Sequence, residues 1–178
     1  MARLAAVTLW LVLSGLDSQG QGPPNLAPYV PTPPDVVDRM LRLARTGPGD
    51  VVYDLGCGDG KIVIAAAKKF GARGVGIDIN PDLVKVANEN AVKAGVADKT
   101  TFIVGDIFDP KVTFSDASIV TLYLLPELNR RLMPRLKTEL KPGTRIVSNS
   151  FEMGDAWPPE KVEHVGNFYV YLWTIAPR

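Results

Sequence analysis

Short apolar segments alternate with helical patterns along this chain, and the alternation constrains its fold more than any other feature. Val and Ile are frequent in the segments 51–53, 74–79 and 101–104, and helical patterns occupy 61–70 and 82–94. Consecutive strands separated by helices pair in parallel and leave the helices to cover both faces of the sheet. The sequence therefore predicts an α/β fold with a mostly parallel sheet.

The C-terminal part continues this alternation and then departs from it. Two further strands and a helix between them are expected at 118–124, 144–149 and 127–140. Pro134 is expected either to kink that helix or to start its second half. The last two apolar segments, 162–165 and 168–175, are separated only by Gly166-Asn167, which is typical of a hairpin turn. We therefore expect an antiparallel edge at this end of the sheet.

The N-terminal segment differs from the rest of the chain. Arg3 precedes an apolar stretch at 4–16, and small and polar residues follow. This order is typical of a signal peptide, and the stretch is shorter than the about 20 apolar residues of a spanning helix. Export or membrane tethering is therefore expected, and a cytoplasmic location otherwise. The predicted parts are a signal-peptide-like or membrane-targeting leader at 1–22, an extended proline-rich segment at 23–35, and one folded domain at 36–178.

The composition excludes some classes of partner and says little about the fold. The formal net charge is +1, which gives no reason to expect a nucleic-acid partner. A single cysteine cannot form an internal disulfide. No histidine and cysteine residues have the spacing of metal ligands, so no metal site is expected.

A glycine-rich loop follows the first expected strand. It leads directly into the helical pattern at 61–70 and reads Gly56-Cys57-Gly58-Asp59-Gly60. Its glycines let the backbone approach a ligand closely, and the helix N-terminus offers free N–H groups that suit a carboxylate or a phosphate. The spacing is G-x-G-x-G, which differs from the G-x-G-x-x-G of dinucleotide sites. The loop predicts a ligand site at the carboxyl end of the sheet.

Three acids stand at the ends of the first three expected strands. Asp54 precedes the glycine loop, where it would repel a pyrophosphate and attract a cationic group such as a sulfonium. Asp78 ends the second strand, about 20 positions after the loop, where an acid holds a ribose diol. Asp106 follows the third strand and is suited to accept from an exocyclic amine, with Ile107 placed to pack on adenine. Together they predict a site for an adenosyl sulfonium.

The successive motifs at 54–60, 76–78, 105–106 and 140–143 resemble those of the class I S-adenosylmethionine-dependent methyltransferases. The resemblance implies a Rossmann-like, seven-stranded and mostly parallel sheet with helices on both faces and an antiparallel C-terminal strand. It implies S-adenosyl-L-methionine as the cofactor, with the glycines at the methionine moiety, Asp78 at the ribose and Asp106 at the adenine amine. The full set of implied cofactor-binding residues adds Ile79 to Asp54, Gly56, Cys57, Gly58, Gly60, Asp78, Asp106 and Ile107.

A narrower resemblance rests on the stretches 29–33, 54–66 and 121–126. They are similar to the small protein-lysine methyltransferases that modify the ATP synthase c subunit and an adenine nucleotide carrier. This resemblance implies N-methylation of a protein lysine, with Tyr29 and Thr32 closing over the cofactor. Because those proteins carry a hydrophobic segment before the proline-rich stretch, it also implies that the leader targets a membrane.

The methyl acceptor is less well defined by the sequence. Transfer of a methyl group from a sulfonium depends mostly on the alignment of the acceptor with the methyl group. No residue of the sequence stands out as a general base. The candidate catalytic residues are Thr121, Tyr123 and Asn149, of which Tyr123 offers a ring face to a cationic amine. The alternative to a protein lysine is a small molecule such as an amine, thiol or quinone. A nicotinamide oxidoreductase or a non-catalytic nucleotide-binding module is disfavoured by the loop spacing and by Asp54.

Overall fold

The computed structural model describes residues 29–178 of the chain. The leader expected at 1–22, and residues 23–28 of the proline-rich segment, lie outside the described residues, so export or membrane tethering stays a prediction. Within residues 29–178, no helix is both long enough and apolar enough to cross a membrane.

The described elements follow the expected alternation closely, with boundaries that shift by one or two residues. In chain order they are α1 (Pro34–Leu43), β1 (Val51–Leu55), α2 (Lys61–Phe70), β2 (Arg73–Asp78), α3 (Pro81–Ala94), β3 (Thr100–Val104), β4 (Ile119–Leu122), α4 (Pro126–Glu139), β5 (Arg145–Asn149), β6 (Lys161–Val165) and β7 (Phe168–Thr174). Because β4 ends at Leu122, Tyr123 lies in the connection to α4 rather than in the strand.

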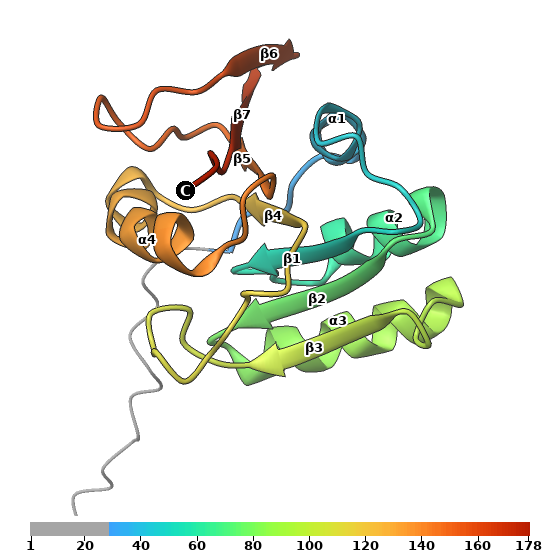
Figure 1. The fold of residues 1–178 in the computed structure, drawn as a ribbon. Helices are drawn as coiled ribbons and strands as arrows, with labels where there is room; N and C mark the ends of the chain where they lie inside the picture. Colours follow the sequence, from blue (N-terminus) through green and yellow to red (C-terminus); the bar gives the residue numbers. More distant parts are fainter. Residues whose placement is uncertain (1–28) are drawn as a thin grey trace, which may run out of the picture.

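These strands form a seven-stranded sheet in the order β3-β2-β1-β4-β5-β7-β6. Neighbours from β3 to β5 pair in parallel, whereas β7 is antiparallel to both β5 and β6. The reversed strand is therefore β7, and the expected mostly parallel sheet with an antiparallel C-terminal strand is confirmed. Figure 1 shows the arrowheads of β1, β2 and β3 at the same edge of the sheet, which is where loops that follow parallel strands gather.

Helices cover both faces of the sheet, as expected. On one face, α1 and α2 pack on the strands through a buried cluster that includes Met40, Ile62 and Val147, and α3 joins α2 through Ala91. The second face is covered by α4 and by the connection 105–118 between β3 and β4. Figure 1 shows α2 and α3 alongside β1 to β3, with α4 apart from them.

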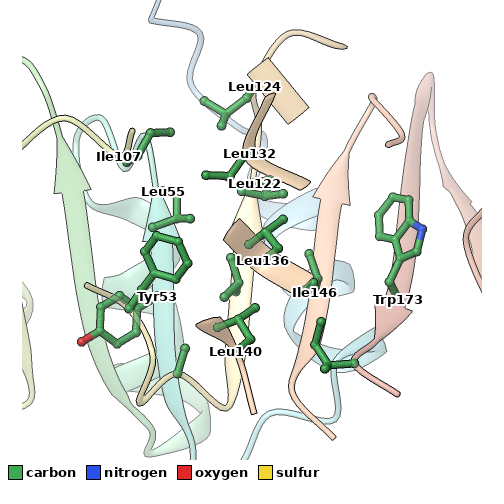
Figure 2. Close-up of a cluster of buried hydrophobic side chains, with 14 of the residues drawn as sticks. Tyr53, Leu55, Ile107, Leu122, Leu124, Leu132, Leu136, Leu140, Ile146 and Trp173 are labelled. Atoms are coloured by element: carbon green, nitrogen blue, oxygen red, sulfur yellow. The ribbon is translucent and has the colours of Figure 1, made fainter. Parts of the chain in front are cut away.

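Figure 2 shows how α4 is attached to the second face of the sheet. Leu132, Leu136 and Leu140 are fully buried and lie over strand residues such as Leu122 and Ile146. Burying each leucine side chain contributes about 1.5–3 kcal/mol. Leu132 and Leu136 lie four positions apart on one face of α4, and Leu140 directly follows the helix, so the three leucines together pack α4 against β1, β4 and β5.

Pro34 and Pro134 both lie within helices. The first helix begins at Pro34, inside the segment expected to be an extended linker, because proline is favoured in the first turn, where its missing N–H costs nothing. Asp35 lies in that first turn, where a negative charge is favourable. Helix α4 continues through the exposed Pro134, so the helix does not start a second half there.

Candidate active site

The glycine loop 56–60 is fixed to the neighbouring strand by its backbone. The N–H groups of Gly56 and Cys57 both donate to the carbonyl of Ile77 on β2, at 2.8 and 3.0 Å. The N–H of Gly60 donates to the carbonyl of Cys57 at 3.0 Å and closes the turn. The N-cap of α2, Gly60, has no side chain; the N–H of Lys61 donates to Oδ1 of Asp59 at 3.3 Å, and the following N–H groups of the first turn are left available to an anionic ligand group.

Asp78 connects this loop to the next helix. Its Oδ2 accepts from the N–H of Gly58 at 2.8 Å, and its Oδ1 accepts from the N–H of Asn80 at 2.9 Å. Asn80 in turn caps α3, because its side-chain oxygen accepts from the N–H of Asp82 at 2.9 Å. A carboxylate offers about four acceptor positions, so both oxygens of Asp78 keep capacity for a ribose diol.

Asp54 is buried at the end of β1 and is paired with β4. It is 3% exposed, and its Oδ1 accepts from the hydroxyl of Thr121 at 2.8 Å. The parallel register places these two residues opposite each other. Burial raises the pKa of Asp54 to about 7; the Thr121 hydrogen bond opposes the shift, and the charges of Asp78 and Asp59 add to it. The site thus holds a carboxyl that a bound cation would ionise.

This raised pKa predicts that cofactor binding depends on pH. A cationic ligand favours the ionised form of Asp54, so its binding must displace a proton below a pH of about 7. We expect the affinity for S-adenosylmethionine to fall by up to about tenfold per pH unit below 7 and to level off above it. Calorimetric titration from pH 5.5 to 8.5 measures this. The matched Asp54→Asn variant should bind weakly with a flatter profile; an equally steep profile would assign the dependence to another group.

Asp106 begins the connection that follows β3. Its Oδ1 accepts from the N–H of Phe108 at 2.8 Å, and this bond closes a tight turn around Ile107. A carboxylate has a second oxygen with its own acceptor positions, so Oδ2 can accept from a ligand amine. Ile107 is 8% exposed and contributes an apolar surface beside the carboxylate.

The segment before α1 lies against the glycine loop. A Cβ atom on Gly58 would come within 2.6 Å of the Tyr29 ring, so only glycine allows the ring this close to the loop. Burial and the nearby Asp59 carboxylate raise the pKa of the Tyr29 hydroxyl to about 12, so Tyr29 stays neutral. Thr32 is buried nearby, with 7% of its surface exposed. The described part of the proline-rich segment is therefore a wall of the site rather than a spacer.

One cavity joins these features. The three acids at the carboxyl ends of β1, β2 and β3 share it, as the sequence predicted. Among the described residues that line the cavity, four carboxylates outnumber the ammonium of Lys61, so its field favours a cationic ligand. The predicted residues on its wall are Tyr29, Thr32, Asp54, Gly56, Cys57, Gly58, Asp78, Ile79, Asp106, Ile107 and Tyr123.

Gly60 is predicted to bind the cofactor but does not line the cavity. It is the N-cap of α2, with φ of +78°, and its back is packed against Phe102 and Ala87. Its contribution is to the shape of the loop. The sequence could not separate this glycine from Gly56 and Gly58, because that distinction depends on which side of the loop α3 packs.

Two of the three candidate catalytic residues also lie away from the cavity wall. Thr121 is fully buried and donates to Asp54, so it holds a carboxylate instead of facing an acceptor. Asn149 is fully buried too; its Oδ1 accepts from the Ser150 hydroxyl at 3.0 Å, and its Nδ2 has no partner among the described residues. Strand alternation places both residues on the same face of the sheet as Val147, which packs in the cluster beneath α1 and α2.

Tyr123 is the candidate that does line the cavity, and it has an aromatic neighbour that the sequence did not indicate. Its ring is stacked on Phe151, with centroids 6.2 Å apart and an interplanar angle of 23°. Phe151 is anchored from behind, because its carbonyl accepts from the Ser148 hydroxyl and from Asn129 of α4. The adjacency of β4 and β5 was the available signal, since residues that follow neighbouring parallel strands meet at one edge.

Cys57 is a packing residue within the loop. It is 6% exposed, and its Sγ would be 2.7 Å from a Cβ atom on Gly76 of β2. Burial, with the nearby Asp54 and Asp78 charges, raises the pKa of the thiol well above its ordinary value. A neutral, enclosed thiol is a poor nucleophile. Among residues 29–178, no group of three or more histidine, cysteine, aspartate or glutamate side chains could hold a metal ion.

The sheet order, the glycine loop and the three acids around one cavity define a class of protein, the S-adenosylmethionine-dependent methyltransferases. The family model described as the ANTKMT methyltransferase domain matches residues 54–161. The chain belongs to this family, and S-adenosylmethionine is its cofactor.

Relatives with known names extend this match over most of the chain. A protein-lysine N-methyltransferase of Saccharolobus islandicus (strain REY15A) is 46% identical over 153 residues, which cover 83% of this chain and 93% of that protein. The adenine nucleotide translocase lysine N-methyltransferase of Mus musculus is 32% identical over 172 residues, which cover 97% of this chain and 73% of that longer protein. A crystal structure of an RNA methyltransferase from Salinibacter ruber in complex with S-adenosyl-L-homocysteine is 54% identical, with a TM-score of 0.81, and covers 84% of this chain and 95% of that one.

Proposed function

We propose that this enzyme transfers a methyl group from S-adenosylmethionine to the ε-amino group of a protein lysine. The observation that carries the proposal is the match to the Saccharolobus protein-lysine N-methyltransferase, which extends over 93% of that protein's length. When bound, the cofactor supplies an electrophilic methyl group on a sulfonium. In the proposed orientation, Gly56 and Gly58 lie at its methionine part, Asp78 accepts from the ribose and Asp106 accepts from the adenine amine.

The wall of the cavity on the β4 side suits a lysine side chain. Tyr123, Leu124 and Leu128 line it, whereas the four carboxylates come from β1, from β2 and from the loops after β1 and β3. Removing the proton from a lysine with an ordinary pKa costs about 4–5 kcal/mol at pH 7. An apolar wall disfavours the charged ammonium and so favours the neutral amine that attacks the methyl group. Tyr123, whose ring is stacked on Phe151, offers a ring face to the cationic amine as it enters.

The proposal is tested by locating the transferred label. Purified enzyme is incubated with methyl-labelled cofactor and cell extract, and portions are treated with protease, ribonuclease or a small-molecule extraction. We expect protease-sensitive label, with methyl-lysine identified by mass spectrometry. Label released by ribonuclease would indicate the RNA acceptor suggested by the name of the Salinibacter relative. Label recovered among small molecules would favour an amine, thiol or quinone acceptor.

Removing the Tyr123 ring should impair the acceptor step alone. Because Tyr123 lines the cavity next to β4, which lies on the other side of β1 from β2 and β3, we expect Tyr123→Ala to lower kcat/KM for the acceptor protein by about tenfold. Affinity for S-adenosylhomocysteine should stay within about threefold of the wild type, because the ring is not needed to hold the nucleoside. Tyr123→Phe, which keeps the ring, is the control and should retain most activity. If Tyr123→Ala lowered kcat/KM for the acceptor and the affinity for S-adenosylhomocysteine by the same factor, Tyr123 would not belong to the acceptor side of the cavity.

A further inference from the structure

The connection 105–118 between β3 and β4 carries part of the site without regular structure of its own. It places Asp106, Ile107 and Phe108 on the cavity wall, yet it contains no helix or strand. Asp106 forms a turn with its own neighbours, since its side chain accepts from Phe108 and its carbonyl accepts from the N–H of Asp109 at 2.9 Å. These local bonds shape the turn but do not fix its position relative to the sheet.

The connection is held at its start, where the N–H of Gly105 donates to the carbonyl of Asp78 at 2.9 Å, and Arg135 of α4 adds an attachment along residues 107–112. Its Nη1 donates to the carbonyls of Ile107 and Asp109, and its Nη2 donates to the carbonyl of Val112 at 2.8 Å. Its remaining two donors bind Glu139, from Nε at 2.6 Å and from Nη2 at 2.9 Å. All five N–H donors of the guanidinium are therefore used, three of them on carbonyls of the connection.

The surroundings of this guanidinium make it hard to replace. The Arg135 side chain is only 16% exposed, and the guanidinium lies 4.7 Å from the centre of the Phe114 ring of the same connection. A lysine would bring three donors on one nitrogen and cannot reach three separate carbonyls and a carboxylate together. Each shielded carbonyl left without its charged donor weakens the attachment by a factor of about ten or more.

We propose that Arg135 is a positioning residue that sets the adenine end of the cofactor site and thereby the selectivity of the enzyme for the adenine base. Arg135 does not itself line the cavity, so it acts through the connection that carries Asp106 and Ile107. The inference rests on the proposed orientation in which Asp106 accepts from the adenine amine.

The test compares two cofactor products that differ only at the base. S-adenosylhomocysteine carries the amine, and S-inosylhomocysteine carries a carbonyl oxygen in its place. For Arg135→Lys we expect affinity for the adenosyl compound to fall about tenfold or more, with little change for the inosyl compound, so that the preference shrinks. General loosening of the fold would instead weaken both equally. Arg130→Lys is the matched control on the same helix, where Arg130 forms an exposed pair with Glu127 at 3.1 Å.

Two further variants separate the possible failures. If Asp106→Asn leaves the adenine preference unchanged, the proposed cofactor orientation is wrong, whatever Arg135 does. If Asp106→Asn removes the preference while Arg135→Lys keeps it, the positioning role is wrong. Should Arg135→Lys not fold, Glu139→Gln replaces it: this partly exposed substitution loosens the guanidinium and should reduce the preference about twofold. A wild-type preference in Glu139→Gln would then overturn the inference.

Discussion

Asp78→Asn should lower the affinity for S-adenosylhomocysteine by about 100-fold or more. The carboxylate of Asp78 accepts one backbone N–H on each oxygen, from Gly58 and Asn80. An amide offers only one oxygen, so its NH₂ group would face one of these N–H donors, and a hydrogen bond to a charged acceptor is typically worth about 1.5–3 kcal/mol. The same change weakens the acceptor proposed for the ribose diol. The variant therefore weakens both the hydrogen bond that holds the glycine loop and the hydrogen bonds to the ligand.

Isothermal titration of the folded variant measures this loss, with circular dichroism as the check on folding. Asp82→Asn is the control, because Asp82 lies exposed in the first turn of α3, four positions along the chain from Asp78. Its affinity should remain within about twofold of the wild type. If Asp78→Asn bound the ligand within threefold of the wild type, the bridge between the glycine loop and α3 would not be the element that organises the site.

Gly60→Ala should be among the most destabilising single-methyl changes in the domain, at about 2–5 kcal/mol. Gly60 has φ of +78°, which an alanine adopts only with strain. Its added Cβ would also lie 2.6 Å from the Phe102 ring and 2.9 Å from the Cβ of Ala87 on α3. Because Ala87 lies on α3 and Phe102 on β3, relief would require the start of α2 to move away from both elements.

Gly95→Ala provides a matched comparison for this prediction. Gly95 ends α3 with φ of +71°, but no atom of the described residues lies within 4 Å of where its Cβ would be. The Gly95→Ala variant should therefore lose only the free energy of unfolding that the strained backbone costs, about 1–2 kcal/mol. Urea denaturation of both variants gives the difference. Equal losses would show that the packing against Phe102 and Ala87 adjusts freely, and the loop would then be less rigid than its contacts indicate.

The parts of the fold that the sequence predicted are those governed by local rules. Asn80-Pro81 specifies the start of α3 through an Asn cap and a proline at the first helical position. The alternation of strands and helices specifies parallel pairing, and Gly166-Asn167 specifies the β6–β7 hairpin. Asp54, Asp78 and Asp106 could be placed around one cavity because parallel strands deliver their carboxyl ends to a common edge.

Side-chain direction at the strand ends could not be predicted in the same way. Thr121 and Tyr123 are two positions apart, yet Thr121 is buried against Asp54 whereas Tyr123 lines the cavity, because β4 ends at Leu122 and the chain turns there. Asn149 was expected near the acceptor, but it is fully buried where β5 pairs with the adjoining strand β7. A shift of two residues in a strand end is below what a propensity pattern resolves.

By itself, the sequence determined the order of strands and helices, the edge of the sheet where ligands bind, and the acids at the carboxyl ends of β1, β2 and β3. Each of these depends on neighbours in the chain. The tertiary structure alone decided that Arg135 of α4 holds the connection 105–118, that Phe151 stacks on Tyr123, and that Gly60 faces α3 rather than the cavity. Those contacts join residues far apart in sequence, and only the packing of whole elements against the sheet brings them together.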